Sequence, residues 1–114
     1  MMHEFSICQS IIQIVSNQLE TESPKVEKII LTIGQLAAID TESLKFWFPV
    51  AARNTKVDSA ELDISISKGR AKCQTCKQKF DLEKLYQACT FCHSYDREVL
   101  SGMEMLVNKI QLQH

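Results

Sequence analysis

Two C-x-x-C pairs are the feature that most constrains the fold of this chain. Each pair presents two sulfurs from one short turn, and two such pairs, here twelve residues apart, can close one tetrahedral Zn²⁺ site. Four thiolates fill the coordination sphere and leave no position for a reacting water, so we expect a structural metal. The predicted zinc ligands are Cys73, Cys76, Cys89 and Cys92.

The alternative reading of these cysteines is a pair of disulfides. Disulfides need an oxidising compartment, which a secretory signal usually accompanies. The segment 1–8 lacks the basic flank, apolar run and cleavage site of such a signal, and no apolar stretch approaches the ~20 residues that span a bilayer. We therefore expect a cytoplasmic protein with reduced cysteines and no membrane partner.

Charge is divided unevenly along the chain, although the net charge is only −1. Residues 1–67 carry five Lys and Arg against nine Asp and Glu, a net of −4, whereas residues 68–97 carry seven against three, a net of +4. The basic segment is consistent with three interpretations: a zinc-ribbon module that binds nucleic acid, a surface that binds an acidic protein, or a solvated face without a partner. Few aromatic residues accompany these charges and the whole chain is slightly acidic, so we expect no nucleic acid.

Apolar residues at three- and four-residue steps predict two amphipathic helices. The first runs from His3 to Leu19 and is ended by residues 21–24. The second begins at an N-cap, either Asp40 or Thr41, and carries the apolar stripe Leu44, Phe48 and Ala51 or Ala52. Pro49 falls within this second pattern and predicts a kink or an early break, because proline lacks the helical N–H.

Three segments have the character of strands. Residues 25–33 are rich in β-branched residues and end at Gly34, and residues 60–68 alternate with Leu62, Ile64 and Ile66 pointing inward. Met103, Met105 and Val107 continue the alternation, with a bulge expected near Asn108.

Together these elements predict an α+β fold: two helices packed on a three-stranded sheet, with an inserted four-cysteine zinc-ribbon lobe. The predicted domains are residues 1–67 plus 102–114, a nickel-binding α+β domain on the reading given below, and residues 68–101, the zinc-binding domain.

The first residues suggest a second metal site. The terminal amine, the amide nitrogens of Met2 and His3, and the His3 imidazole can offer four nitrogens in a plane, which suits Ni(II) or Cu(II) rather than tetrahedral Zn²⁺. On spacing alone this signal is weak, because a histidine near a terminus is usually just exposed.

The whole chain, taken in order, resembles the HypA/HybF family of nickel metallochaperones in [NiFe]-hydrogenase maturation. The matching features are the Met-His-Glu start before a helix, residues 33–35, the 40–48 segment, the double C-x-x-C, and residues 102–105. The resemblance implies a metallochaperone with Ni(II) as transported cargo and Zn(II) as a structural ion. It implies nickel binding at Met1, Met2, His3 and Glu4, with His3 as the essential side chain, and zinc binding by the four cysteines.

The resemblance also implies partners. These are a hydrogenase maturation GTPase, the [NiFe]-hydrogenase large subunit and, in some organisms, urease maturation factors.

One departure from the family pattern concerns the N-terminus. The family has histidine second, whereas here it is third. Either the chain effectively begins at Met2, which restores the family arrangement, or the Met1 amine is the ligand and completes the chelate described above. The sequence leaves both readings open.

Other chemistry is less well supported by the residues. No nucleophile–base set and no glycine-rich phosphate loop is visible, so we do not expect an enzyme. A redox C-x-x-C explains one pair but not two, and a c-type haem motif ending at His93 would leave Cys73 and Cys76 unused. We expect His93 to neighbour the zinc site, where it can replace a thiolate if coordination rearranges, and Cys8 to be a small buried apolar residue.

Overall fold

The computed structural model describes residues 4–113, and the chain divides into two units. The helical unit contains Ile39–Ser65 and the described parts of 1–31 and 106–114. The cysteine unit contains Thr32–Ala38 and Ile66–Met105. The sequence-based domain boundaries stay a prediction, and they did not anticipate that residues 32–38 group with the cysteines.

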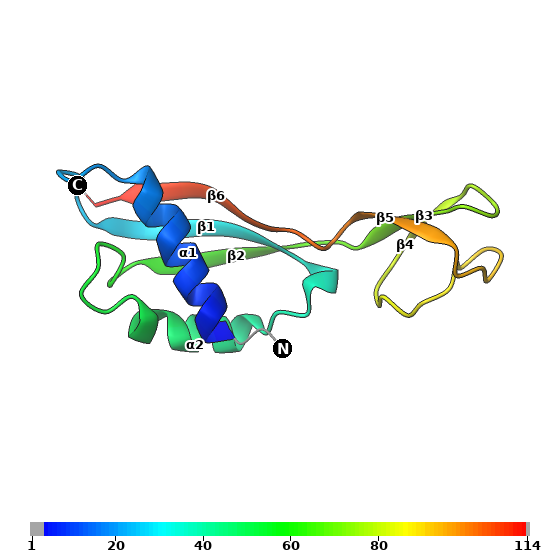
Figure 1. The fold of residues 1–114 in the computed structure, drawn as a ribbon, viewed down its shortest axis with the longest axis horizontal. Helices are drawn as coiled ribbons and strands as arrows, with labels where there is room; N and C mark the ends of the chain where they lie inside the picture. Colours follow the sequence, from blue (N-terminus) through cyan, green and yellow to red (C-terminus); the bar gives the residue numbers. More distant parts are fainter. Residues whose placement is uncertain (1–3, 114) are drawn as a thin grey trace. The chain divides into compact units, whose positions relative to one another are not determined.

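Both expected helices are present in the helical unit (Figure 1). Helix α1 spans Glu4–Gln18 and buries Ile7, Cys8, Ile11 and Val15. Helix α2 spans Thr41–Ala51, and Asp40 is its N-cap: one carboxylate oxygen accepts from the backbone N–H groups of Glu42 and Ser43, at 3.1 and 3.3 Å.

The expected early break at Pro49 does not occur. Helix α2 continues to Ala51, and the Ala52 N–H closes the last turn by donating to the Phe48 carbonyl at 2.9 Å. Pro49 is the third residue from the end of the helix, so its missing N–H removes one i→i−4 hydrogen bond, to the carbonyl of residue 45.

A three-stranded sheet with the order β2-β1-β6 completes the predicted α+β fold. Its strands are β1 (Val26–Gly34), β2 (Glu61–Ser67) and β6 (Met105–Leu112). The central strand β1 buries Ile29, Leu31 and Ile33, which are at most 1% exposed. Alternate β-branched and leucine side chains therefore form the sheet's contribution to the core, as the sequence predicted.

Two expectations about the strands are wrong. Ile66 was expected to point inward but is 57% exposed, because the chain has already left the helical unit at this residue. Met103 was expected in a strand, but β6 begins at Met105 and Met103 is 51% exposed. Here Gly102 has a φ of 104° and its N–H donates to the Glu104 carboxylate at 2.9 Å, so the backbone turns before the strand starts. The expected bulge near Asn108 stays a prediction.

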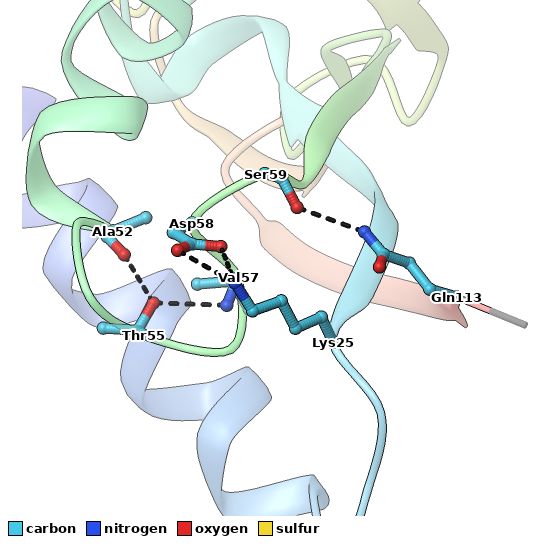
Figure 2. Close-up of polar contacts among 7 residues, drawn as sticks. All are labelled: Lys25, Ala52, Thr55, Val57, Asp58, Ser59 and Gln113. Atoms are coloured by element: carbon cyan, nitrogen blue, oxygen red, sulfur yellow. Dashed lines mark hydrogen bonds and ion pairs between the residues drawn. The ribbon is translucent and has the colours of Figure 1, made fainter.

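Polar contacts hold the end of β6 to the start of β1 and to the loop that follows α2 (Figure 2). The Gln113 backbone N–H donates to the Lys25 carbonyl at 2.8 Å, and the Gln113 side-chain amide donates to the Ser59 hydroxyl at 3.1 Å. The Lys25 ammonium pairs with Asp58 at 3.2 Å. The Thr55 hydroxyl donates to the carbonyl of Ala52, the C-cap of α2, at 2.6 Å. These contacts fasten the helical unit at one end of its sheet.

Candidate metal centre

The cysteine unit is built on a second small sheet, with the order β4-β3-β5. Strand β3 (Arg70–Cys73) pairs antiparallel with both β4 (Lys79–Asp81) and β5 (Arg97–Ser101). The sequence did not predict these short strands. The buried core beneath them is small, and two of its members are cysteines: Leu36, Ala71, Cys73, Phe80, Leu82 and Cys89.

The first C-x-x-C pair forms a tight turn, which we call the first knuckle (residues 73–78). The Cys73 N–H donates to the Gln78 carbonyl at 2.9 Å, and the Lys77 N–H donates back to the Cys73 carbonyl at 3.0 Å. Lys77 has a φ of 67°, a left-handed conformation that non-glycine residues rarely adopt. The Cys76 N–H lies 3.4 Å from the Cys73 sulfur, so the turn directs a backbone donor at the thiol.

The second pair repeats the same turn in the second knuckle (residues 89–94). The Cys89 N–H donates to the Ser94 carbonyl at 2.8 Å, and the His93 N–H donates to the Cys89 carbonyl at 3.0 Å. His93 has a φ of 64° and the Phe91 N–H lies 3.3 Å from the Cys89 sulfur. Two equivalent turns that tolerate the same backbone strain indicate that both are shaped for one common ligand.

The two knuckles bring their four sulfurs together. All four lie within 4.8 Å of one another, and the cross-knuckle distances are 3.5 Å for Cys73–Cys92 and 3.7 Å for Cys76–Cys89. A tetrahedral ion with Zn–S bonds of ~2.3 Å has sulfur–sulfur edges of about 3.8 Å. Among residues 4–113 this is the one cluster of metal-ligating side chains, and its dimensions fit Zn²⁺.

The knuckle backbone makes two of the thiols acidic. The Cys76 N–H at its sulfur lowers the pKa of Cys73 to about 6. Burial opposes ionisation of Cys89, but the N–H groups of Cys92 and Phe91 outweigh it and lower the pKa of Cys89.

The other two thiols remain protonated. The Ser94 N–H favours a Cys92 thiolate, but burial and the neighbouring sulfurs outweigh it and raise the pKa of Cys92 to about 12. The Gln78 N–H likewise favours the Cys76 thiolate, yet burial and Cys73 raise the pKa of Cys76. Repulsion among like charges in a small volume therefore limits ionisation until a cation arrives.

Of the predicted nickel residues, Met1, Met2 and His3 lie outside the described residues. Glu4 is described, is partly exposed, and is the first residue of α1.

Two further cysteine and histidine expectations can be placed. Cys8 is fully buried, its thiol donates to the Leu44 carbonyl at 3.4 Å, and burial raises its pKa to about 11, so it is a neutral core residue as expected. His93 follows Cys92 directly, and its side chain is exposed. Its backbone conformation shapes the second knuckle, a role that the sequence did not predict.

Leu36 is the residue of this region that sequence reasoning missed. It lies in a short 3-10 helix, η1 (Gln35–Ala37), is 5% exposed, and its N–H donates to the Gly102 carbonyl at 2.7 Å. The one sequence signal for its burial was an isolated leucine soon after the glycine that ends a strand. No periodic pattern includes it, so its place in the core of the cysteine unit was not evident.

The fold and site together define a class: a small α+β protein with a paired-knuckle, four-thiol metal centre. The chain matches the family model "Hydrogenase/urease nickel incorporation, metallochaperone, hypA" over residues 2–112. This match covers nearly the whole chain, and the protein therefore belongs to the HypA family.

Relatives and solved structures agree with this assignment. A hydrogenase maturation factor HypA from Francisella philomiragia is 46% identical over 109 residues, which are 96% of this chain and 97% of that protein. Another, from Chlorobaculum tepidum, is 35% identical over 98% of this chain and 100% of its own length. The solution structure of the Ni metallochaperone HypA from Helicobacter pylori superposes with a TM-score of 0.70 at 26% identity, covering 97% of each chain.

Proposed function

We propose that this protein is a nickel metallochaperone that binds Ni(II) at its N-terminus and helps to deliver it to a [NiFe]-hydrogenase during maturation. Membership of the HypA family, over residues 2–112, is the observation that carries this proposal. The nickel is cargo, whereas the zinc is a resident structural ion.

The zinc ligands in this proposal are Cys73, Cys76, Cys89 and Cys92. Their sulfurs have the spacing of a tetrahedral site, and four thiolates leave no open position for catalysis. Without a metal, four thiolates so close together would repel one another, so Cys92 and Cys76 keep their protons. Zinc would neutralise part of this negative charge and allow all four sulfurs to ionise. Reduced thiolates of this kind fit a cytoplasmic protein.

The nickel ligands are proposed at Met1, Met2 and His3, with Glu4 acting from outside the coordination shell. The imidazole of His3 anchors the site, and nitrogens of the terminal amine and backbone complete it. A site at a chain end can open by local fraying, whereas a closed thiolate site exchanges slowly. The nickel cargo should therefore exchange faster than the structural zinc, because the ligands of the nickel can move more readily.

The proposed partners follow from the proposed role in nickel delivery. The protein acts within the hydrogenase maturation machinery. We propose a maturation GTPase and the hydrogenase large subunit as its direct partners, and urease maturation factors where a urease is present. Nucleotide hydrolysis belongs to the GTPase, and this chain acts without catalysis of its own. Across residues 4–113, no helix is both long and apolar enough to cross a membrane.

Nickel titration of tag-free protein tests this proposal, after the first residue has been identified by mass spectrometry. His3→Ala should abolish tight Ni(II) binding and leave zinc content unchanged, while Glu4→Gln should have a smaller effect. If the amine is a ligand, N-terminal acetylation should also weaken binding strongly. Unchanged nickel affinity in both the His3→Ala protein and the acetylated protein would contradict the proposed cargo site.

A further inference from the structure

The first turn of α1 is joined to α2 by an aromatic contact. The rings of Phe5 and Trp47 meet edge to face, with centroids 6.0 Å apart and planes at 83°. Phe5 is the second residue after His3 in the sequence and the second residue of α1. The contact therefore holds the point from which the proposed nickel-binding segment extends.

A second contact lies about one turn further along α1 and one turn back along α2. The Cys8 thiol donates to the Leu44 carbonyl at 3.4 Å. Phe5 and Cys8 are three residues apart on α1, and Leu44 and Trp47 are three residues apart on α2, so the two contacts are successive steps of one helix pair. Cys8 and Leu44 are fully buried, whereas Trp47 is 42% exposed. The Phe5–Trp47 contact is thus the outer one, at the start of α1.

The exposure of Trp47 argues that it does more than fill the core. Its other aromatic neighbour, Phe46, is 69% exposed and meets it at 5.1 Å. Because Trp47 is two-fifths exposed, it gains less from apolar burial than a core tryptophan would, yet it keeps an oriented contact with Phe5. The first turn of a helix has unpaired N–H groups and frays readily, so an anchor at its second residue has a large effect on local order.

We infer that Trp47, acting through Phe5, is a positioning residue for the N-terminal nickel site. This inference rests on the proposed function. Metal binding must order the consecutive residues that form the chelate, and a fixed first turn of α1 removes part of that entropic cost. Trp47 does not touch the metal; it fixes the helix that the ligand segment enters. Trp47 is also the chain's one tryptophan, so its fluorescence reports on this region alone.

The test compares Ni(II) binding and release in the natural protein, Trp47→Ala and Trp47→Phe. Trp47→Ala should weaken nickel binding by about three- to tenfold, mainly through faster release, since one aromatic contact contributes on that scale. Trp47→Phe keeps an aromatic edge and should restore most of the affinity. Ile14→Ala is the matched control, because Ile14 is 40% exposed on the same helix as Phe5 and should leave nickel binding unchanged.

A measurement on the natural protein makes the test independent of how well the variants fold. Adding Ni(II) should change Trp47 emission with saturation at one equivalent, and His3→Ala should remove this change. Unchanged nickel release in Trp47→Ala, or nickel binding without any change in emission, would overturn the positioning role. If His3→Ala itself still binds nickel tightly, the proposed function fails instead, so the two failures are distinguishable.

Discussion

The two units of this protein reach order by different means. The helical unit buries large apolar side chains from four elements, among them Ile11, Ile29, Leu31, Leu44 and Phe48, each at most 2% exposed. The cysteine unit has a core of six residues, and two of these are thiols at the metal centre. A small unit with so little apolar burial needs another source of stability, and four metal–sulfur bonds supply it. Apolar burial therefore stabilises the helical unit, whereas zinc stabilises the cysteine unit.

Removal of zinc should give the largest effect and separate the two units. Binding of a structural zinc contributes on the order of 10 kcal/mol, so its loss should unfold residues 66–105. Hydrogen exchange should show loss of protection in β3 and β5, with protection retained in α1 and β1. Cys76→Ala should behave in the same way, and Cys8→Ala should keep its zinc, because the Cys8 thiol contacts Leu44 and not the metal centre. A fully ordered cysteine unit without metal would refute this division.

Proton release should reveal how the metal-free thiols share their charge. The raised pKa values of Cys76 and Cys92 mean that both are protonated at neutral pH, whereas the lowered pKa of Cys73, about 6, makes it a thiolate. Zinc should therefore displace at least the protons of Cys76 and Cys92 at pH 7, and its apparent affinity should fall at least a hundredfold for each unit of decreasing pH. Below pH 6 the slope should steepen, because Cys73 is then protonated too. Chelator competition between pH 5.5 and 8 measures this, and a pH-independent affinity would contradict it.

Gly69→Ala should destabilise the cysteine unit alone. A Cβ at Gly69 would overlap the Leu82 carbonyl oxygen and press on the Leu36 side chain, and the Gly69 backbone cannot move freely because its carbonyl accepts the Leu82 N–H at 2.8 Å. We expect a cost of about 1–3 kcal/mol, visible as faster zinc loss to a chelator. Lys84→Ala, at an exposed position in the same unit and outside both knuckles, is the control. Equal zinc retention in the two variants would count against this packing.

Substitution of two lysines in the helical unit should give the smallest effects on stability. The Lys56 ammonium donates to three backbone carbonyls that follow α1, those of Glu20, Thr21 and Ser23, at 2.7–3.0 Å. Lys56→Met should cost about 1–2 kcal/mol. Lys25→Met removes only an exposed ion pair with Asp58 and should cost under about 0.5 kcal/mol. Thermal unfolding should rank the two in this order, with zinc content unchanged; the reverse order would show that the carbonyl contacts matter little.

Sequence reasoning succeeded where a periodic pattern or a fixed spacing carries the information. The apolar faces of α1 and β1, the Asp40 cap and the convergence of four cysteines all follow from local rules. It failed where the chain passes from one unit to the other. Ile66 continues an alternating pattern although the helical unit has ended there, and Leu36 belongs to no pattern although it is buried.

The backbone geometry of the two knuckles could not be predicted from sequence patterns either. Lys77 and His93 adopt left-handed conformations at equivalent positions, and neither residue type signals this. The conformation is imposed by the hydrogen bonds that close each turn around its cysteines. Residue spacing thus predicted which side chains meet, whereas the backbone strain that brings them together appears only in the folded structure.

Zinc and nickel should occupy separate sites with different roles in this protein. Native mass spectrometry of the intact protein, loaded with zinc and one equivalent of Ni(II), tests it most directly. The natural protein should carry one of each metal, His3→Ala should carry zinc alone, and Cys76→Ala should carry nickel alone. Loss of both metals in either single variant, or nickel retained by His3→Ala, would contradict the account.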